Sequence, residues 1–139
     1  MSSGRHTARE RALQALYQID LSSVDPAEAL AAAIAADEDA VDAKTQAFAK
    51  ALVDGVVAHL ADLDALIQKH SLNWRVERMP KIDRNVLRLA VYELQFDAET
   101  PGRVVLNEAI ELGKAFGTEE SSAFINGILD KVAQELGRK

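Results

Sequence analysis

The sequence predicts an all-α protein of six or seven amphipathic helices, arranged as two small packed helical bundles. Three observations predict this class. Alanine, leucine and glutamate are abundant, and the alternation of β-branched residues typical of strands is missing. Apolar residues recur at steps of three and four, and most of the three prolines and seven glycines fall where such a run ends. The 139 residues fit one domain, with helical subdomains at about 1–70 and 71–139.

The first two helices are predicted at about 5–21 and 26–36. One apolar face of the first helix is formed by Ala12, Leu13, Leu16 and Ile19. Asp25 is expected to cap the second helix, because its carboxylate can accept hydrogen bonds from the first free backbone amides. Pro26 suits the first helical position, where a missing backbone N–H costs nothing.

A long apolar repeat predicts a third helical stretch at about 42–69. It forms either one central helix or two helices with a bend near Gly55 or His59. Residues 71–82 are rich in charge and are expected to be irregular, with Pro80 as a helix breaker.

Three more helix boundaries are predicted in the last part of the chain. Asp83 is expected to cap a helix that reaches about Phe96. The next helix covers about 103–116 and ends at Gly117, a residue type suited to the position after a helix. Thr118 and the two acids after it open the last helix. Its predicted buried stripe consists of Phe124, Ile125, Ile128, Leu129, Val132 and Leu136.

The composition excludes several classes of function. The absence of cysteine excludes disulfides, zinc knuckles, iron–sulfur clusters and thiol nucleophiles. No apolar run is long enough to span a membrane, and the N-terminus lacks the apolar core of a signal peptide, so we expect a cytoplasmic location. Phosphate-binding loops, the zinc-protease motif and the hydrolase elbow are absent, and the three histidines have no metal-ligand spacing. We therefore expect no enzyme, no metal and no cofactor.

Charge is segregated along the chain, whose overall net charge is −6. Residues 1–20 carry a net charge of +1, residues 21–64 carry −7, residues 65–93 carry +3 and residues 94–139 carry −3. An acidic stretch thus separates two basic ones. Ordinary solvated helix faces explain such a pattern, yet it is the local field that decides where a phosphate binds.

The first helix carries charge where its apolar face is expected. At about 100° per residue, Arg5 and Arg9 lie over the apolar stripe. Because a buried unpaired arginine is costly, either the first turn projects beyond the core or these arginines meet acids. A projecting start that also carries His6 and Thr7 would grip phosphates, and a frayed terminus is the alternative. Tyr17 either stacks on a base or completes the edge of the core.

Charged residues on later helices also have two interpretations each. Arg84 and Arg88 share one side of their helix, while Glu93 lies within its apolar arc and needs a partner. Arg75 or Arg78 of the irregular segment is expected to supply it. On the helix at 103–116, one polar face is either solvated or a docking face for a basic protein. This face consists of Asn107, Glu108, Glu111 and Lys114.

Four strings of residues resemble a single known family. They are ARERALQALYQ at 8–18, IDRNVLRLAVYEL at 82–94, and NEAIELGKAFG at 107–117 followed by FINGILD at 124–130. Together with the region of Trp74 they are similar to the bacterial transcription antitermination factors of the NusB family, over nearly the whole chain. The resemblance implies an all-helical fold of two bundles and a non-enzymatic role in RNA binding.

The resemblance also implies partners. Proteins of this family pair with the small-subunit ribosomal protein NusE, and the pair binds the boxA sequence of nascent RNA. That complex joins NusA, NusG and RNA polymerase to suppress termination, notably in ribosomal RNA operons, and it assists small-subunit assembly.

Site residues follow from the resemblance by position. The family's arginine-rich RNA-binding motif corresponds to Arg5, His6, Thr7 and Arg9, and its aromatic residue near the RNA corresponds to Tyr17. A second RNA-side patch comprises Glu120, Ser121 and Phe124. The face toward NusE is expected to comprise Asp83, Arg84, Arg88, Glu108 and Glu111. With only two arginines in the motif, we expect weak RNA binding by the protein alone. We also expect Arg9→Glu to weaken RNA binding without affecting the fold, and an Asp83 substitution to weaken the NusE complex.

Two rival interpretations come from other classes of protein. A related domain precedes the catalytic domain of certain ribosomal RNA cytosine methyltransferases, but this sequence ends at Lys139 and has no cysteine, which argues against an enzyme. The second rival is a helical scaffold that self-associates as a homodimer and so covers its RNA surface. A band-shift with boxA RNA, with and without NusE, separates a scaffold from an RNA binder.

Overall fold

The computed structural model describes residues 2–37 and 39–139, and within them the only regular elements are helices, which confirms the all-α class. The chain divides into two compact units, residues 1–58 and 59–139. The sequence places the subdomain boundary later, at about residue 70. The difference is one helix, which packs with the second unit.

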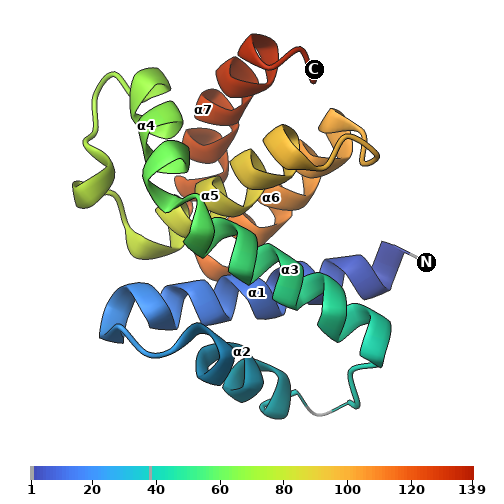
Figure 1. The fold of residues 1–139 in the computed structure, drawn as a ribbon. Helices are drawn as coiled ribbons and strands as arrows, with labels where there is room; N and C mark the ends of the chain where they lie inside the picture. The colour runs from blue at the N-terminus through green and yellow to red at the C-terminus, as the bar shows by residue number, and fades with distance from the viewer. Residues whose placement is uncertain (1, 38) are drawn as a thin grey trace. The chain divides into compact units, whose positions relative to one another are not determined.

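The first unit is a three-helix bundle (Figure 1, blue to green). It consists of α1 (Ser2–Ser22), α2 (Pro26–Ala35) and α3 (Ala43–Ala58), and each helix packs against the other two. Small residues on α1 allow close packing, since three of its buried side chains are alanine. The buried apolar side chains of these helices are Ala8, Ala12, Leu13, Ala15, Leu16, Ala29, Leu30, Ala49, Leu52, Val53 and Val56.

Two predicted boundaries in this part of the chain are confirmed. Asp25 caps α2, because its carboxylate accepts hydrogen bonds from the backbone amides of Ala27 and Glu28 at 3.1 and 3.3 Å. The helical run after residue 42 is interrupted at His59, where φ is −115° and ψ is 20°, and not at Gly55. His59 begins the second unit, and its ring stacks there on the ring of Phe96, at 4.4 Å from centroid to centroid.

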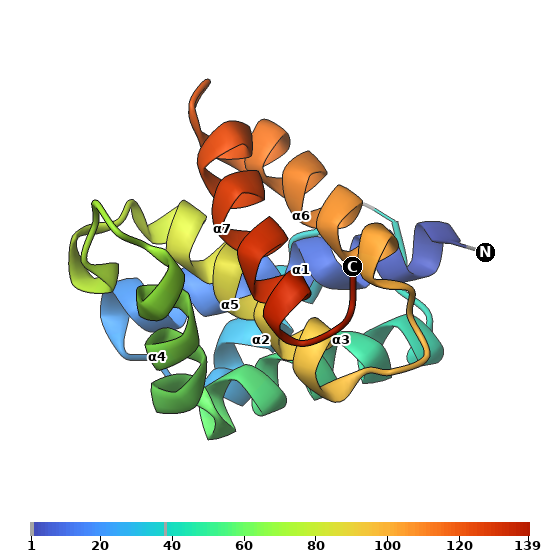
Figure 2. The same ribbon diagram turned by 90° about the horizontal axis from the view of Figure 1, so that it is seen from above.

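The second unit is built around one central helix (Figure 2). Its elements are α4 (Leu60–His70), the 3₁₀ turn η1 (Val76–Arg78), α5 (Lys81–Phe96), α6 (Gly102–Phe116) and α7 (Ser121–Glu135). Helix α5 packs against α4, α6 and α7, and so buries residues around most of its circumference. Its apolar core residues are Val86, Leu87, Leu89, Ala90, Val91 and Leu94.

One predicted helix-end role in this unit is wrong and one predicted helix end is confirmed. Helix α5 begins at Lys81 with Pro80 as the N-cap residue, so Asp83 lies inside the first turn and does not cap it. Helix α6 ends at Phe116 with Gly117 as its C-cap residue, as predicted, and φ of Gly117 is −98°. The small size of Gly117 matters here, because a Cβ there would lie 2.7 Å from the Cβ of Ser121. Glycine therefore allows the first turn of α7 to pack against the end of α6.

An ion-pair cluster joins α4 to α7 on the surface of the second unit. The Oε1 atom of Glu135 lies 2.9 Å from the Lys69 ammonium and 2.8 Å from Nε2 of His70. Hydrogen bonds from Lys69, and then from His70, hold the pKa of Glu135 below its ordinary value of 4.5. Among the described residues, no helix combines the length and hydrophobicity needed to cross a membrane.

Candidate nucleic-acid interface

The start of α1 presents one exposed arginine beside an aromatic ring. The Arg5 guanidinium carbon lies 4.5 Å from the ring centroid of Phe48 on α3, and Arg5 remains exposed. The Arg9 guanidinium lies 5.5 Å from the same centroid, but Arg9 is only 3% exposed. The ring thus accommodates both arginines that the sequence places over the apolar stripe. Of the two, Arg5 is the one open to a phosphate.

The neighbours of Arg5 on α1 have mixed electrostatic surroundings. The Nε2 atom of His6 lies 3.4 Å from Oε2 of Glu10, one helical turn later. Thr7 lines a hollow of about 230 Å³ with an acidic rim. The acids on that rim are Asp37, Asp39 and Asp42. These three acids repel a phosphate from the hollow beside Thr7.

The burial of Tyr17 on α1 is compatible with both of its predicted settings. Its side chain is half-buried, as expected for a tyrosine that completes the edge of a core. Part of the ring nevertheless stays accessible. Base stacking by Tyr17 therefore stays a prediction.

The N-terminus of α7 is fixed by a buried hydrogen-bond network. The Ser121 hydroxyl donates to Oδ1 of Asp83 at 2.7 Å and accepts from the backbone amide of Thr118 at 2.9 Å. Ser121 is 1% exposed and Asp83 is 5% exposed. The sequence assigns Ser121 to an RNA patch and Asp83 to a partner face, yet the two side chains bond to each other inside one unit. Both are therefore placed to hold the turn before α7.

The two other predicted residues of this patch are accessible. Glu120 is exposed, and Phe124 is half-buried. The prediction that Phe124 belongs to the fully buried stripe of α7 is therefore wrong, and so is the same prediction for Leu136, which is also half-buried. Leu136 lies beyond the last residue of α7, which ends at Glu135, so the fully buried stripe is shorter than predicted. Its fully buried members are Ile125, Ile128, Leu129, Val132 and Ala133.

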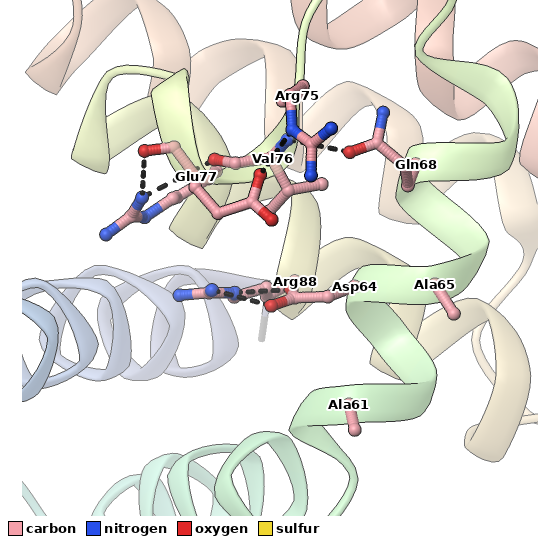
Figure 3. Close-up of a pocket in the computed structure, with 9 residues that line it drawn as sticks. Ala61, Asp64, Ala65, Gln68, Arg75, Val76, Glu77 and Arg88 are labelled. Carbon is pink, nitrogen blue, oxygen red and sulfur yellow. Dashed lines mark hydrogen bonds and ion pairs between the residues drawn. The ribbon is translucent and has the colours of Figure 1, made fainter.

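The arginines of α5 bond within the second unit, around a pocket of about 550 Å³ (Figure 3). The Arg88 guanidinium donates from Nε and Nη2 to the two carboxylate oxygens of Asp64 at 2.7 and 2.8 Å. It also donates from Nη1 to Asn85 at 3.1 Å. Arg84 donates to the backbone carbonyl of Glu77 at 3.1 Å. In this arrangement Arg88 stabilises the packing of α4 on α5.

The prediction that Arg75 or Arg78 pairs with Glu93 is wrong. Arg75 is exposed and pairs with Glu77, with Nε 3.4 Å from Oε2. Arg78 is also exposed, at the end of η1. Glu93 is buried in the second unit, whereas both of these arginines are exposed. The irregular segment therefore keeps its arginines at the surface.

The polar face of α6 has the features of a solvated surface. Glu111 is exposed and lies 3.5 Å from the Lys114 ammonium, while Glu108 is half-buried. An exposed pair of this kind contributes little stability. Its role as a docking face for a basic protein stays a prediction.

A comparison with protein families matches residues 6–134 to the NusB family. The chain belongs to the NusB family. It is 52% identical over 136 residues to the transcription antitermination protein NusB of Myxococcus xanthus, covering 96% of this chain and 97% of that protein. The resemblance drawn from the four strings is thereby confirmed.

Solved NusB structures have the same fold. NusB of T. maritima aligns with a TM-score of 0.87 at 38% identity, covering 94% of this chain and 91% of that one. A structure of the antitermination factors NusB and NusE in complex with dsRNA aligns with a TM-score of 0.88 at 30% identity. That alignment covers 97% of this chain and 99% of that chain.

Sequence reasoning gave no site role to Phe48 or Lys44, which line the same hollow as Arg5. The signal for Phe48 was indirect, since two arginines over an apolar stripe need a compensating partner, and an aromatic ring can be one. Only packing of α3 on α1 identifies which ring. Among the described residues, no group of three histidine, aspartate or glutamate side chains is placed to hold a metal ion.

Replacing Ser121 by alanine should lower the free energy of unfolding by about 1–3 kcal/mol, because Asp83 loses a buried hydrogen-bond donor. Denaturant unfolding followed by circular dichroism measures this loss. The matched control is Ser122→Ala, which removes a hydroxyl that donates to the Ile110 carbonyl at 3.3 Å and should cost under about 1 kcal/mol. Equal losses in the two variants would contradict the structural role given to Ser121.

Proposed function

We propose that this NusB-family chain acts in transcription antitermination by binding boxA RNA together with NusE. The single observation that carries the proposal is its near-complete alignment with the NusB chain of a NusB–NusE–dsRNA complex. The proposed setting is ribosomal RNA operon transcription, with NusA, NusG and RNA polymerase in the same complex, and small-subunit assembly as a further role. The proposed action is binding and involves no catalytic step.

The electrostatics favour shared RNA binding with NusE over binding by this chain alone. Arg5 is the exposed arginine of the motif, and the hollow on the Thr7 side has an acidic rim. One or two phosphate contacts give weak, salt-sensitive binding. A partner that carries further RNA contacts raises the overall affinity, because the second contact becomes intramolecular. NusE is the partner proposed for this role.

Titrating labelled boxA RNA with the protein, with and without NusE and at two salt concentrations, tests the proposal. We expect NusE to raise the affinity at least about tenfold, higher salt to lower it, and a scrambled RNA to bind more weakly. Size-exclusion chromatography of the free protein accompanies the titration. Failure of boxA RNA to bind in every condition, together with a stable homodimer, would replace the proposal by the self-associating scaffold.

A further inference from the structure

The start of α1 and the start of α3 form one open hollow of about 730 Å³ within the first unit. This volume lies in the range of about 300–1,000 Å³ that is typical of small-ligand sites. The residues that line it are Gly4, Arg5, Asp42, Lys44, Thr45, Ala47 and Phe48. None of the residues that the family resemblance assigns to RNA binding lies on α3. The α3 side of the hollow therefore has no role in RNA binding assigned to it.

The two helices are held close at this point by small residues and a helix cap. A Cβ at Gly4 would lie 3.1 Å from Oγ1 of Thr45, so glycine lets α1 approach α3 closely. Asp42 accepts a hydrogen bond from the Thr45 amide at 2.7 Å and thereby fixes the first turn of α3. Hydrogen bonds from the Thr45 amide and hydroxyl hold the pKa of Asp42 below its ordinary value of 3.8, so this carboxylate is charged at neutral pH.

The hollow brings together an aromatic ring, a guanidinium and an ammonium. Arg5 lies over the half-buried ring of Phe48, at 4.5 Å from its centroid. Lys44 is exposed one turn earlier on the same helix as Phe48. A planar cation held on a ring, beside a second cation, is the combination with which proteins stack a base and neutralise its phosphate. Asp42 also lines the hollow, and its charge interacts with that of the nearby Lys44.

We propose that this hollow holds one nucleotide of the bound RNA, with the base stacked on the Arg5–Phe48 pair and a phosphate on Lys44. Phe48 is then a positioning residue that holds the Arg5 side chain in place. This inference rests on the proposed function and extends the RNA path from α1 onto α3.

A double-mutant cycle between Arg5 and Phe48 tests the positioning role, with boxA affinity measured in the presence of NusE. We expect Phe48→Leu to weaken binding about 5–10-fold, Phe48→Tyr to bind within about twofold of the unchanged protein, and Arg5→Ala to weaken it about tenfold. Because both changes remove the same contact, the double variant should be no weaker than Arg5→Ala. Additive losses, or Phe48→Leu with unchanged affinity, would overturn the positioning role.

Lys44 provides an arm of the test that leaves the core untouched. Lys44→Ala should weaken boxA binding about 3–10-fold and reduce the slope of log affinity against log salt by about one. The matched control is Lys50→Ala on the same helix, where the ammonium lies 2.5 Å from Asp54 and should change neither quantity. Equal behaviour of the two lysine variants overturns the nucleotide site. Tight boxA binding by the unchanged protein in that same experiment leaves the proposed function standing, whereas its absence overturns both.

Discussion

Replacing Arg9 by glutamate should lower the free energy of unfolding by about 3–5 kcal/mol. Arg9 is 3% exposed and its guanidinium lies 5.5 Å from the centroid of the Phe48 ring. A carboxylate in this place would be buried without its solvent shell and would face the negative side of the ring. The loss would be a large part of the total stability of about 5–15 kcal/mol usual for a domain. Urea unfolding followed by far-ultraviolet circular dichroism measures it.

The control for this prediction is the same charge reversal at Arg5, which also lies over Phe48 but is exposed. Arg5→Glu should change stability by less than about 1 kcal/mol, since solvent still reaches the new carboxylate. A similar small change in Arg9→Glu would contradict the burial of Arg9. The prediction also revises the expectation that Arg9→Glu leaves the fold intact. Arg5, and not Arg9, is the suitable position for a charge reversal that probes RNA binding.

Replacing Arg88 by alanine should lower the free energy of unfolding by about 2–4 kcal/mol. The variant loses two hydrogen bonds to Asp64 and one to Asn85, and it leaves the Asp64 carboxylate without its cation. The Asp64 side chain is 28% exposed, so water partly replaces the lost partner and limits the cost. Denaturant unfolding of the two proteins side by side gives the difference.

The matched control for Arg88 is Arg75→Ala, in which the lost pair is exposed on both sides, at 74% for Arg75 and 69% for Glu77. Its cost should stay below about 1 kcal/mol. If Arg88→Ala were no more costly than Arg75→Ala, the Asp64 pair would not be a stabilising contact. A weaker NusE complex in Arg88→Ala would have to be separated from this loss of stability before Arg88 is assigned to the interface. A weaker NusE complex in an Asp83 variant needs the same separation, because the Asp83 carboxylate accepts a hydrogen bond from Ser121 within the second unit.

The sequence by itself determined the helices of this protein and its family. Helix positions follow from signals within a few residues of one another, namely the apolar repeat and the Asp25–Pro26 start of α2. The family follows from strings whose order along the chain is visible without a fold. Even the interruption at His59 was one of two positions that the repeat indicated.

Only the tertiary structure decided what the charged residues do. Asp83 meets Ser121 across 38 positions, and Arg88 meets Asp64 across 24. Two arginines of α1 lie over the ring of Phe48 on α3. Such contacts depend on which faces of two helices pack and on their register, and a helical repeat specifies only that a face is buried. The sequence therefore located the polar groups along each helix, whereas packing decided which became internal bonds and which, like Arg5, stay exposed.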